Sequence, residues 1–200
     1  MLRSIYRDPL ANLNIERLLG LLKNAQNQSK RISDLIANLL DVSRFSGGRF
    51  ELNPQEINIS DKVKAIAEGF KEEAERADCT YEYKVDEDIM AHVDPVQIEQ
   101  VVTNLISNAI KYGRGKPIHI NLVKEHNKAI LTVEDNGIGI DNEKIKDVFK
   151  PFTRLVKDPS YKGLGVGMYI TSQIVEAHKG KIKIDSELGQ GTTFRVELPI

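Results

Sequence analysis

Three polar side chains recur within one predicted helix, and their types suit the binding of a metal-bound phosphate. The helix spans residues 94–112, and Asn104, Asn108 and Lys111 share one of its faces because they are spaced by four and three residues. Amide oxygens are hard, neutral ligands that suit Mg²⁺, and a lysine one turn further along can meet a phosphate as a point charge. Taken alone, these residues could equally form a solvated polar face.

Two glycine-rich segments could complete such a site. The first, Asp135 to Ile140, follows a predicted strand and offers a carboxylate that can accept from an exocyclic amine, with glycines that let the backbone approach a ligand. The second, Gly163 to Met168, has glycine at every second position before a predicted helix, where backbone N–H groups suit phosphate oxygens. Each segment taken singly could also be a plain turn or a flexible loop.

The second segment excludes two common nucleotide sites. It lacks the Gly-Lys-Ser/Thr ending of a P-loop, and it does not follow a strand within a βαβ unit as a dinucleotide-binding motif would.

The composition of the chain excludes further classes of protein and of binding site. A net charge of −1 gives no basic field for nucleic acid, and the single cysteine, Cys79, excludes an internal disulfide framework and fits a reducing compartment. The cysteine and the four histidines show no zinc-ligand spacing.

No apolar run approaches the roughly 20 residues that cross a bilayer, so no membrane segment is expected in this chain. We therefore expect a cytoplasmic location for residues 1–200 and leave open that the full-length protein is anchored in a membrane.

The first fifty residues predict one long helix. From Ile15 to Phe45 apolar or small residues recur in steps of three and four, and Gly47-Gly48 ends the pattern. The stripe is wide enough for a helical bundle, so a partner helix from a second chain is expected; packing on the chain's own globular part is the alternative.

Strands and helices alternate after this helix. Strands are predicted within 50–59 and at 79–85, 89–93, 117–124, 128–134, 181–186 and 192–198, and helices at 60–77, 94–112, 143–149 and 164–178. Asp94, Pro95 and Gln97 form the start of the 94–112 helix as N-cap, N1 and N3. Mostly antiparallel strands with helices on one face predict an α+β, two-layer sandwich.

In this order, the motifs resemble the ATP-binding domain of sensor histidine kinases, in the superfamily shared with DNA gyrase, heat-shock chaperones and mismatch-repair ATPases, whose architecture is the Bergerat ATP-binding fold. The resemblance covers residues 15–200. The matching boxes are Asn104-Leu-Ile-Ser-Asn108-Ala-Ile-Lys111-Tyr112, Asp135-Asn-Gly137-Ile-Gly139-Ile140, Phe149-Lys-Pro-Phe152-Thr-Arg154, Gly163-Leu164-Gly165-Val166-Gly167-Met168 and Gly189-Gln-Gly191-Thr192-Thr-Phe194.

The resemblance implies a site for ATP or ADP and Mg²⁺. Asn108 would be the Mg²⁺ ligand with Asn104 beside it, and Lys111 and Tyr112 would contact phosphate and nucleotide. Asp135 would accept from adenine N6, with Thr192 assisting through water. The whole implied nucleotide site is Asn104, Asn108, Lys111, Tyr112, Asp135, Gly137, Gly139, Ile140, Phe152, Arg154, Gly163, Leu164, Gly165, Val166, Gly167 and Thr192, of which Asn104, Asn108 and Lys111 would be catalytic.

The glycines divide between the two ends of the nucleotide. Gly137 and Gly139 would line the base pocket. Residues 163–167 would hold the phosphates at the end of a mobile lid spanning 152–163, and Phe152 and Arg154 would couple that lid to the site.

The residue type at position 104 distinguishes phosphoryl transfer from ATP hydrolysis. In the superfamily's hydrolases a glutamate one turn before the metal-binding asparagine activates water, and Asn104 stands there in this chain. A neutral amide cannot take a proton from water, so slow ATP hydrolysis is expected.

The expected phosphoacceptor is missing from the first helical region. Residues 15–45 resemble the second helix of the kinase dimerisation hairpin, but no histidine precedes His92. If Pro9 were the proline of the phosphoacceptor motif in the first hairpin helix, Ser4 would stand at the position where that motif has its histidine. A remnant or replacement of the first helix is the favoured interpretation over a shortened hairpin. His178 is expected to be structural, in cationic form at a helix end.

The sequence therefore predicts a partial dimerisation and phosphoacceptor region at 1–48 and an ATP-binding catalytic domain at 49–200. The expected function is that of a protein histidine kinase core in a two-component system, which transfers the γ-phosphoryl group to a histidine outside this chain and cannot autophosphorylate. Expected partners are a response regulator receiver domain and a second copy through the 15–45 helix. The alternative is a degenerate nucleotide-binding signalling module; an ATPase of the gyrase type is disfavoured by Asn104, and an anti-sigma-factor type serine kinase by the 15–45 helix.

Overall fold

The computed structural model describes residues 15–47, 50–156, 158 and 163–200. Residues 1–14, which include the candidate acceptor position Ser4, lie outside the described part. The chain forms two compact units, Met1–Leu40 and Asp41–Ile200, and each is described by itself. The boundary between 48 and 49 stays a prediction.

The first unit contains most of the long helix α1, Ile15–Ser46, as predicted. Its described apolar side chains are largely exposed; the large ones are Leu18, Leu19, Leu21, Leu22, Ile32, Ile36, Leu39 and Leu40. Among the described residues, no helix combines the length and apolarity that crossing a bilayer requires.

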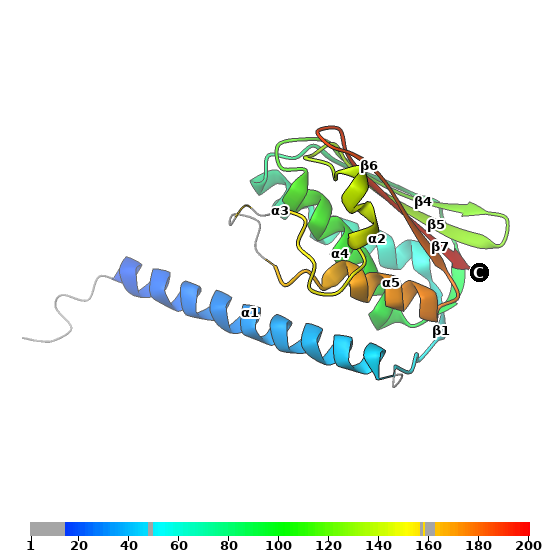
Figure 1. The fold of residues 1–200 in the computed structure, drawn as a ribbon, viewed down its shortest axis with the longest axis horizontal. Coiled ribbons are helices and arrows are strands. Elements are labelled where there is room, and N and C mark those ends of the chain that lie inside the picture. The colour runs from blue at the N-terminus through cyan, green and yellow to red at the C-terminus, as the bar shows by residue number, and fades with distance from the viewer. Residues whose placement is uncertain (1–14, 48–49, 157, 159–162) are drawn as a thin grey trace, which may run out of the picture. The chain divides into compact units, whose positions relative to one another are not determined.

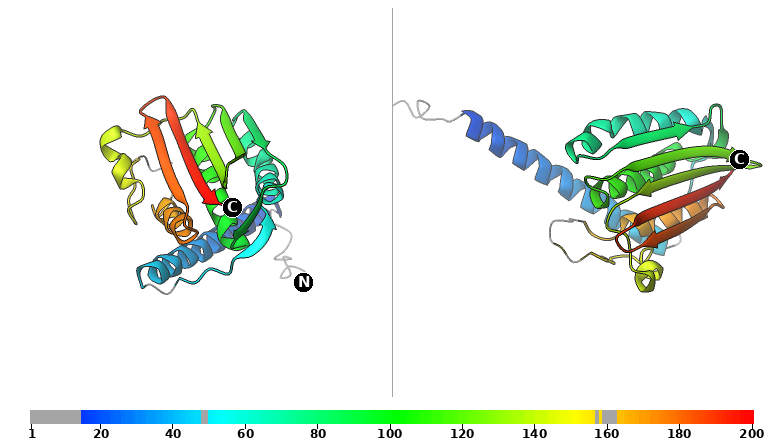
Figure 2. Two further views of the ribbon diagram at one scale, coloured as in Figure 1. Left: turned by 90° about the vertical axis from the view of Figure 1, so that its right-hand side faces the viewer. Right: turned by 90° about the horizontal axis from the view of Figure 1, so that it is seen from above.

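The second unit is built on a five-stranded sheet with the order β2-β4-β5-β7-β6. The strands are β2 Tyr81–Val85, β4 Ile118–Glu125, β5 Lys128–Asp135, β6 Lys181–Glu187 and β7 Gly191–Pro199. β2 pairs with β4 in parallel, and the other pairs are antiparallel. The helices α2 Ile59–Gly69, α4 Pro95–Tyr112 and α5 Gly167–Ala177 cover one face, as Figures 1 and 2 show. The predicted α+β, two-layer sandwich is confirmed.

A second, two-stranded sheet joins β1 Gln55–Asn58 to β3 Met90–Val93. The predicted helix at 60–77 is wrong as one element, because it breaks at Phe70 into α2 and α3 Lys71–Arg76. Ser60, the polar residue at the predicted start of this helix, does not cap it. Asn58 caps α2 by accepting from the backbone of Ser60 and Asp61, whereas the buried Ser60 hydroxyl accepts from the backbone N–H of Ile89.

α5 begins at Gly167, three residues later than predicted. Gly165 has φ +73°, which a right-handed helix cannot contain, and a Cβ there would lie 2.3 Å from the carbonyl oxygen of Thr153. The short helical piece predicted at 143–149 is the 3₁₀-helix η1, Asn142–Asp147.

The core lies between the sheet and its helices. α4 contributes the apolar face expected from the sequence, namely Ile98, Val101, Val102, Leu105 and Ile106, all of which are buried. Because this face is fixed against the sheet, the opposite side of α4, which carries Asn104 and Asn108, turns toward α5.

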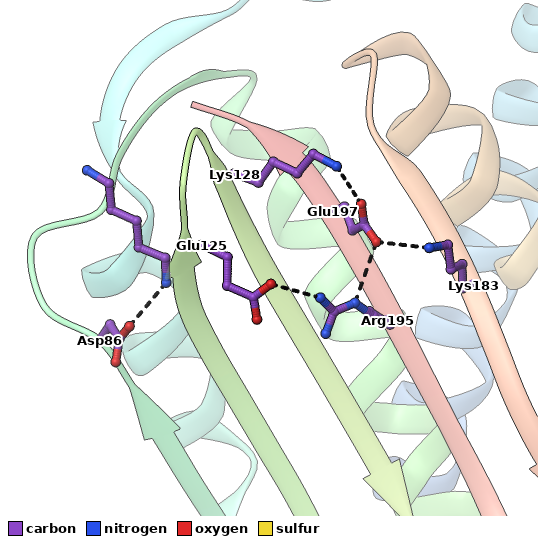
Figure 3. Close-up of polar contacts among 7 residues, drawn as sticks. Asp86, Glu125, Lys128, Lys183, Arg195 and Glu197 are labelled. Atoms are coloured by element: carbon purple, nitrogen blue, oxygen red, sulfur yellow. Dashed lines mark hydrogen bonds and ion pairs between the residues drawn. The ribbon is translucent and has the colours of Figure 1, made fainter.

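The other face of the sheet carries charged side chains (Figure 3). Glu197 lies between Lys128 at 2.8 Å, Lys183 at 3.2 Å and Arg195 at 3.5 Å, and Arg195 also contacts Glu125. Hydrogen bonds from Lys128 and Lys183 lower the pKa of Glu197 to about 2, so the carboxylate stays ionised at every pH at which the protein would be handled.

Asp94, at the N-terminus of α4, forms hydrogen bonds with three segments of the chain. The Asp94 carboxylate accepts from the backbone N–H groups of Val96, Gln97 and Asn53, and its own N–H donates to His178 Nε2 at 2.9 Å. His178 Nδ1 lies 2.8 Å from the Ile174 carbonyl oxygen and must carry the ring proton. The structural role predicted for His178 therefore holds, but its predicted cationic form is wrong, because Nε2 acts as an acceptor.

Replacing Asp94 with alanine is expected to lower the free energy of unfolding by about 2 kcal/mol, because three backbone donors lose their acceptor. Urea unfolding of the two proteins measures the change. Asp141→Ala is a matched control, since Asp141 caps only the short η1 through Glu143 N–H. Equal losses in the two variants would contradict the importance given to the Asp94 cap.

Candidate functional site

Two asparagines of α4 face the first turns of α5. Asn104 Nδ2 donates to the carbonyl oxygen of Gly167 and to Thr171 Oγ1, both at 3.3 Å. A carbonyl oxygen can only accept, so the amide orientation of Asn104 is fixed with its nitrogen toward α5. Asn108 Nδ2 similarly points to Met168 Sδ at 3.1 Å. In both residues the amide oxygen is left for another partner.

Lys111 lies at the end of the same row, close to the second glycine-rich segment. Its Nζ donates to the Tyr112 hydroxyl at 3.0 Å and lies 4.6 Å from the centre of the Tyr112 ring. A Cβ built on Gly163 would be 3.4 Å from this Nζ. The lysine charge therefore lies beside the backbone that was predicted to hold phosphates.

Asp135 ends β5 as a buried carboxylate, 6% exposed. The backbone N–H groups of Gly137 and Thr192 donate to it, and Thr192 is its register partner on β7. Burial raises the pKa of Asp135 to about 6 despite these two donors, and the Glu134 charge adds to the rise. The carboxylate is thus a fixed hydrogen-bond acceptor at neutral pH and a donor below about pH 6.

The loop after Asp135 is packed against two other segments. A Cβ on Gly137 would lie 2.0 Å from the Tyr112 carbonyl oxygen, and one on Gly139 would lie 1.9 Å from that of Glu187. Gly189 N–H also donates to the Ile138 carbonyl. The loop from Asp135 to Ile140 is therefore clamped between the end of α4 and the β6–β7 turn, and side chains larger than hydrogen do not fit at these two glycines.

The other predicted residues differ in burial. Val166 is buried in the core, whereas Leu164 and Ile140 are half-buried and pack against it. Phe152 is 55% exposed with φ +61°, and Arg154 is also exposed. Much of the predicted lid, residues 157 and 159–162, lies outside the described part.

Two residues of the site were not predicted. Thr171 is fully buried on α5 and orients Asn104, and Ser186 on β6 bonds the loop end at Ile140 as well as β7. A signal for both existed, because each is a hydroxyl residue at a position where the helical or alternating pattern calls for an apolar, core-facing side chain.

The arrangement has two chemically different ends. One end is a buried acceptor, Asp135, beside closely packed glycine backbone; the other presents amide oxygens and an ammonium group next to a helix N-terminus. Such a layout suits a ligand with an amine on a flat group and anionic oxygens on the other end. Among the described residues, no three His, Cys, Asp or Glu side chains gather as a metal site. A metal here would depend on the asparagine oxygens and on the ligand's own oxygens.

Comparison with known proteins agrees with this layout. Residues 93–200 match the family model described as histidine kinase-, DNA gyrase B-, and HSP90-like ATPase. The adaptive-response sensory kinase SasA of Synechococcus elongatus is 33% identical over 189 residues, which are 93% of this chain and 49% of SasA. The sensor protein kinase WalK of Staphylococcus epidermidis is 31% identical over 180 residues, 87% of this chain and 29% of WalK.

Solved structures of histidine kinases share the fold of this chain. The histidine kinase AdeS of Acinetobacter baumannii superimposes with a TM-score of 0.74 at 27% identity, covering 90% of this chain and 83% of that one. Full-length ShkA gives a TM-score of 0.76 at 21% identity, covering 90% of this chain and 38% of ShkA, and shows a shared fold. The chain spans about half the length of SasA and less of WalK.

Proposed function

Because the chain belongs to the histidine kinase-, DNA gyrase B- and HSP90-like ATPase family, as the ATP-binding core of a sensor histidine kinase, we propose that it transfers the γ-phosphoryl group of ATP to a histidine outside residues 1–200. The unprotonated nitrogen of the acceptor imidazole attacks the γ-phosphorus with its lone pair, the bond from phosphorus to the bridging oxygen breaks, and ADP leaves with that electron pair. The proton on the other ring nitrogen is then lost to solvent. The observation that carries the proposal is the buried acceptor Asp135 at one end of a site whose other end presents Asn104, Asn108 and Lys111.

The proposed nucleotide site keeps the predicted roles. Asp135 accepts from the adenine 6-amino group, with Thr192 beside it, and Gly137 and Gly139 line the base. Lys111, Tyr112 and the backbone of 163–167 hold phosphate oxygens, and Phe152 and Arg154 link the lid to the site. The depth of Asp135 and its two backbone donors support the first of these roles, because they fix the carboxylate in one orientation.

Mg²⁺ fits the residues present. The NH₂ groups of Asn108 and Asn104 are committed to α5, so their oxygens, which are hard ligands, are available. Asn108 would be the direct ligand and Asn104 its neighbour. When bound, Mg²⁺ would neutralise charge on the phosphate oxygens.

Asn104 also supports transfer over hydrolysis. Its two amide protons are engaged by Gly167 and Thr171, and an amide has no basic group that could activate water. The site can therefore position ATP without a general base for water at this place.

We further propose that the chain does not phosphorylate itself. His178 is buried with both nitrogens bonded. His126 lies in the β4–β5 turn, at the far end of β5 from Asp135, which is about 25 Å for an eight-residue strand. His119 lies beside Glu134 on the opposite sheet face from Asp135, and His92 lies in the separate β1–β3 sheet.

Labelling with γ-labelled ATP tests the proposal. Residues 1–200 alone are expected to acquire no acid-labile label, and a histidine-bearing hairpin from a related sensor kinase added in trans is expected to become labelled. Asn108→Ala should abolish that transfer, and ATP turnover should stay far below that of gyrase-type enzymes. Label on the chain itself, or gyrase-like turnover, would contradict the proposal.

The same labelling experiment distinguishes a kinase from the alternative, a degenerate nucleotide-binding signalling module. A degenerate signalling module would bind ATP but leave the hairpin unlabelled. The retained asparagine row and both glycine segments favour the kinase, since a module acting only by contact does not need all of them.

The remaining partners are also proposals. A receiver domain of a response regulator would accept the phosphoryl group from the histidine, as expected for a two-component sensor kinase. The exposed apolar side chains of α1 support a homodimer formed through residues 15–45. The proposed division of the chain remains 1–48 for the partial dimerisation region and 49–200 for the catalytic domain.

A further inference from the structure

Ser186 forms three contacts that fix the direction of a buried hydrogen-bond chain. Its Oγ accepts from the backbone N–H of Ile140 at 2.8 Å, lies 2.8 Å from the Gly191 carbonyl oxygen and lies 2.9 Å from Thr192 Oγ1. Ser186 and Thr192 are each only 7% exposed. These contacts join β6, β7 and the end of the loop that begins at Asp135.

The positions of the two hydroxyl protons in this hydrogen-bond network follow from the partners of each hydroxyl group. A carbonyl oxygen cannot donate, so the contact between Ser186 and Gly191 uses the single hydroxyl proton of Ser186. The contact with Thr192 then needs a proton from Thr192. With its proton committed to Ser186, Thr192 presents only lone pairs on its remaining side.

Thr192 is the register partner of Asp135, and both side chains lie on the helix-covered face of the sheet. Directly paired residues in antiparallel strands have Cβ atoms about 5 Å apart. The ionised Asp135 carboxylate is also an acceptor only. The buried end of the site therefore offers two neighbouring acceptors and no side-chain donor from this pair.

We propose that Ser186 is a specificity-determining residue that holds Thr192 as an acceptor and thereby rejects purines with a carbonyl at position 6. This inference rests on the proposed nucleotide site. At position 6, the amino group of adenine supplies donors to the pair, whereas an oxo group brings a third acceptor against them. The 6-oxo purine also gains an N1–H donor, but this difference between the ligands is the same for the wild-type and variant proteins and does not by itself change the ratio of their affinities between proteins. Without Ser186, the Thr192 hydroxyl can rotate and donate to a 6-oxo group.

The test measures dissociation constants for ATP and inosine triphosphate, which differ in the purine 6-position and its neighbouring N1, at pH 8. Ser186→Ala is expected to shift the ratio toward inosine triphosphate by about tenfold, the value of one added neutral hydrogen bond. Ser186→Thr keeps the hydroxyl and should keep the wild-type ratio. Ser186→Cys, which fills the space with a weak acceptor, should shift the ratio in the same direction as alanine and serves if the alanine variant does not fold.

Two controls separate specificity from stability. Ser60 is likewise a buried serine that accepts a backbone N–H, so Ser60→Ala should lower the melting temperature without changing the ratio. In a Thr192→Val background, Ser186→Ala should no longer shift the ratio, because no hydroxyl is left to rotate.

Equal weakening of both nucleotides by Ser186→Ala, or a shift that survives in the Thr192→Val background, would overturn the inference. Failure of the wild-type protein to bind ATP would overturn the proposed function instead, so the two failures are distinguishable.

Discussion

Replacing Asp135 with asparagine is expected to weaken ATP binding by at least about 100-fold. The variant loses a charged acceptor, worth about 1.5–3 kcal/mol, and turns an NH₂ group toward the adenine amine, because its amide oxygen is the one acceptor left for the backbone donors. Isothermal titration calorimetry measures the change. Glu134→Gln is the matched control, since it makes the same charge change one residue earlier on the opposite face of the sheet and should leave ATP affinity unchanged.

The fold should not weaken in the Asp135→Asn variant. The folded-state pKa of Asp135 is raised to about 6 by burial, so its contribution to stability is present below the ordinary pKa of 3.8 and lost as pH rises through 6. At pH 8 the buried ionised carboxylate therefore lowers the free energy of unfolding by about 3 kcal/mol, and asparagine removes this cost. A large fall in melting temperature would mean that lost affinity reports unfolding and would contradict this account.

The same pKa predicts how affinity depends on pH. As the pH falls from 8 to 5, Asp135 gains a proton, and the acid can no longer accept from the amine at that oxygen. Because the phosphates of ATP also titrate, the informative quantity is the ratio of wild-type to Asp135→Asn affinity at each pH. That ratio should fall below pH 6, and a flat ratio would contradict the role given to Asp135.

Replacing Gly139 with alanine is expected to abolish ATP binding and to lower the free energy of unfolding by about 3 kcal/mol or more, the range of backbone strain combined with a steric clash. Gly139 has φ +62°, and the new Cβ would lie 1.9 Å from the backbone carbonyl oxygen of Glu187, which cannot move without displacing the β6–β7 turn. The loop that follows Asp135 would be pushed off its support.

Gly115→Ala isolates the strain from the clash. Gly115 has φ +74°, but nothing lies within 4 Å of a Cβ built there. This variant should lose only about 1–2 kcal/mol, measured by urea unfolding, and should keep its ATP affinity. If both variants behave alike, backbone conformation and not contact with the β6–β7 turn determines the effect.

Features that depend on neighbours in sequence could be predicted without the structure. The Asp94-Pro95 start of α4, the buried stripe of that helix and the strand alternation all follow from caps and periodicity within a few residues. The prediction of a single long helix at 60–77 was wrong although Gly69, a helix-weakening residue, directly precedes the break at Phe70. Nothing local marks the inward turn of Ser60 toward Ile89. The helix predicted at 164–178 began too early because Gly165 adopts a left-handed conformation, in close contact with the carbonyl of Thr153.

The sequence by itself determined the inventory of the site: an acid at the end of a strand, two asparagines and a lysine on one helix face, and glycines where backbone must come close. Only the tertiary structure decided their chemical states. The raised pKa of Asp135, the amide orientation of Asn104, the neutral ring of His178 and the proton that Thr192 gives to Ser186 are each set by a buried partner. Such states depend on desolvation and on which group donates each hydrogen bond. Both are properties of contacts between elements that are distant in the chain.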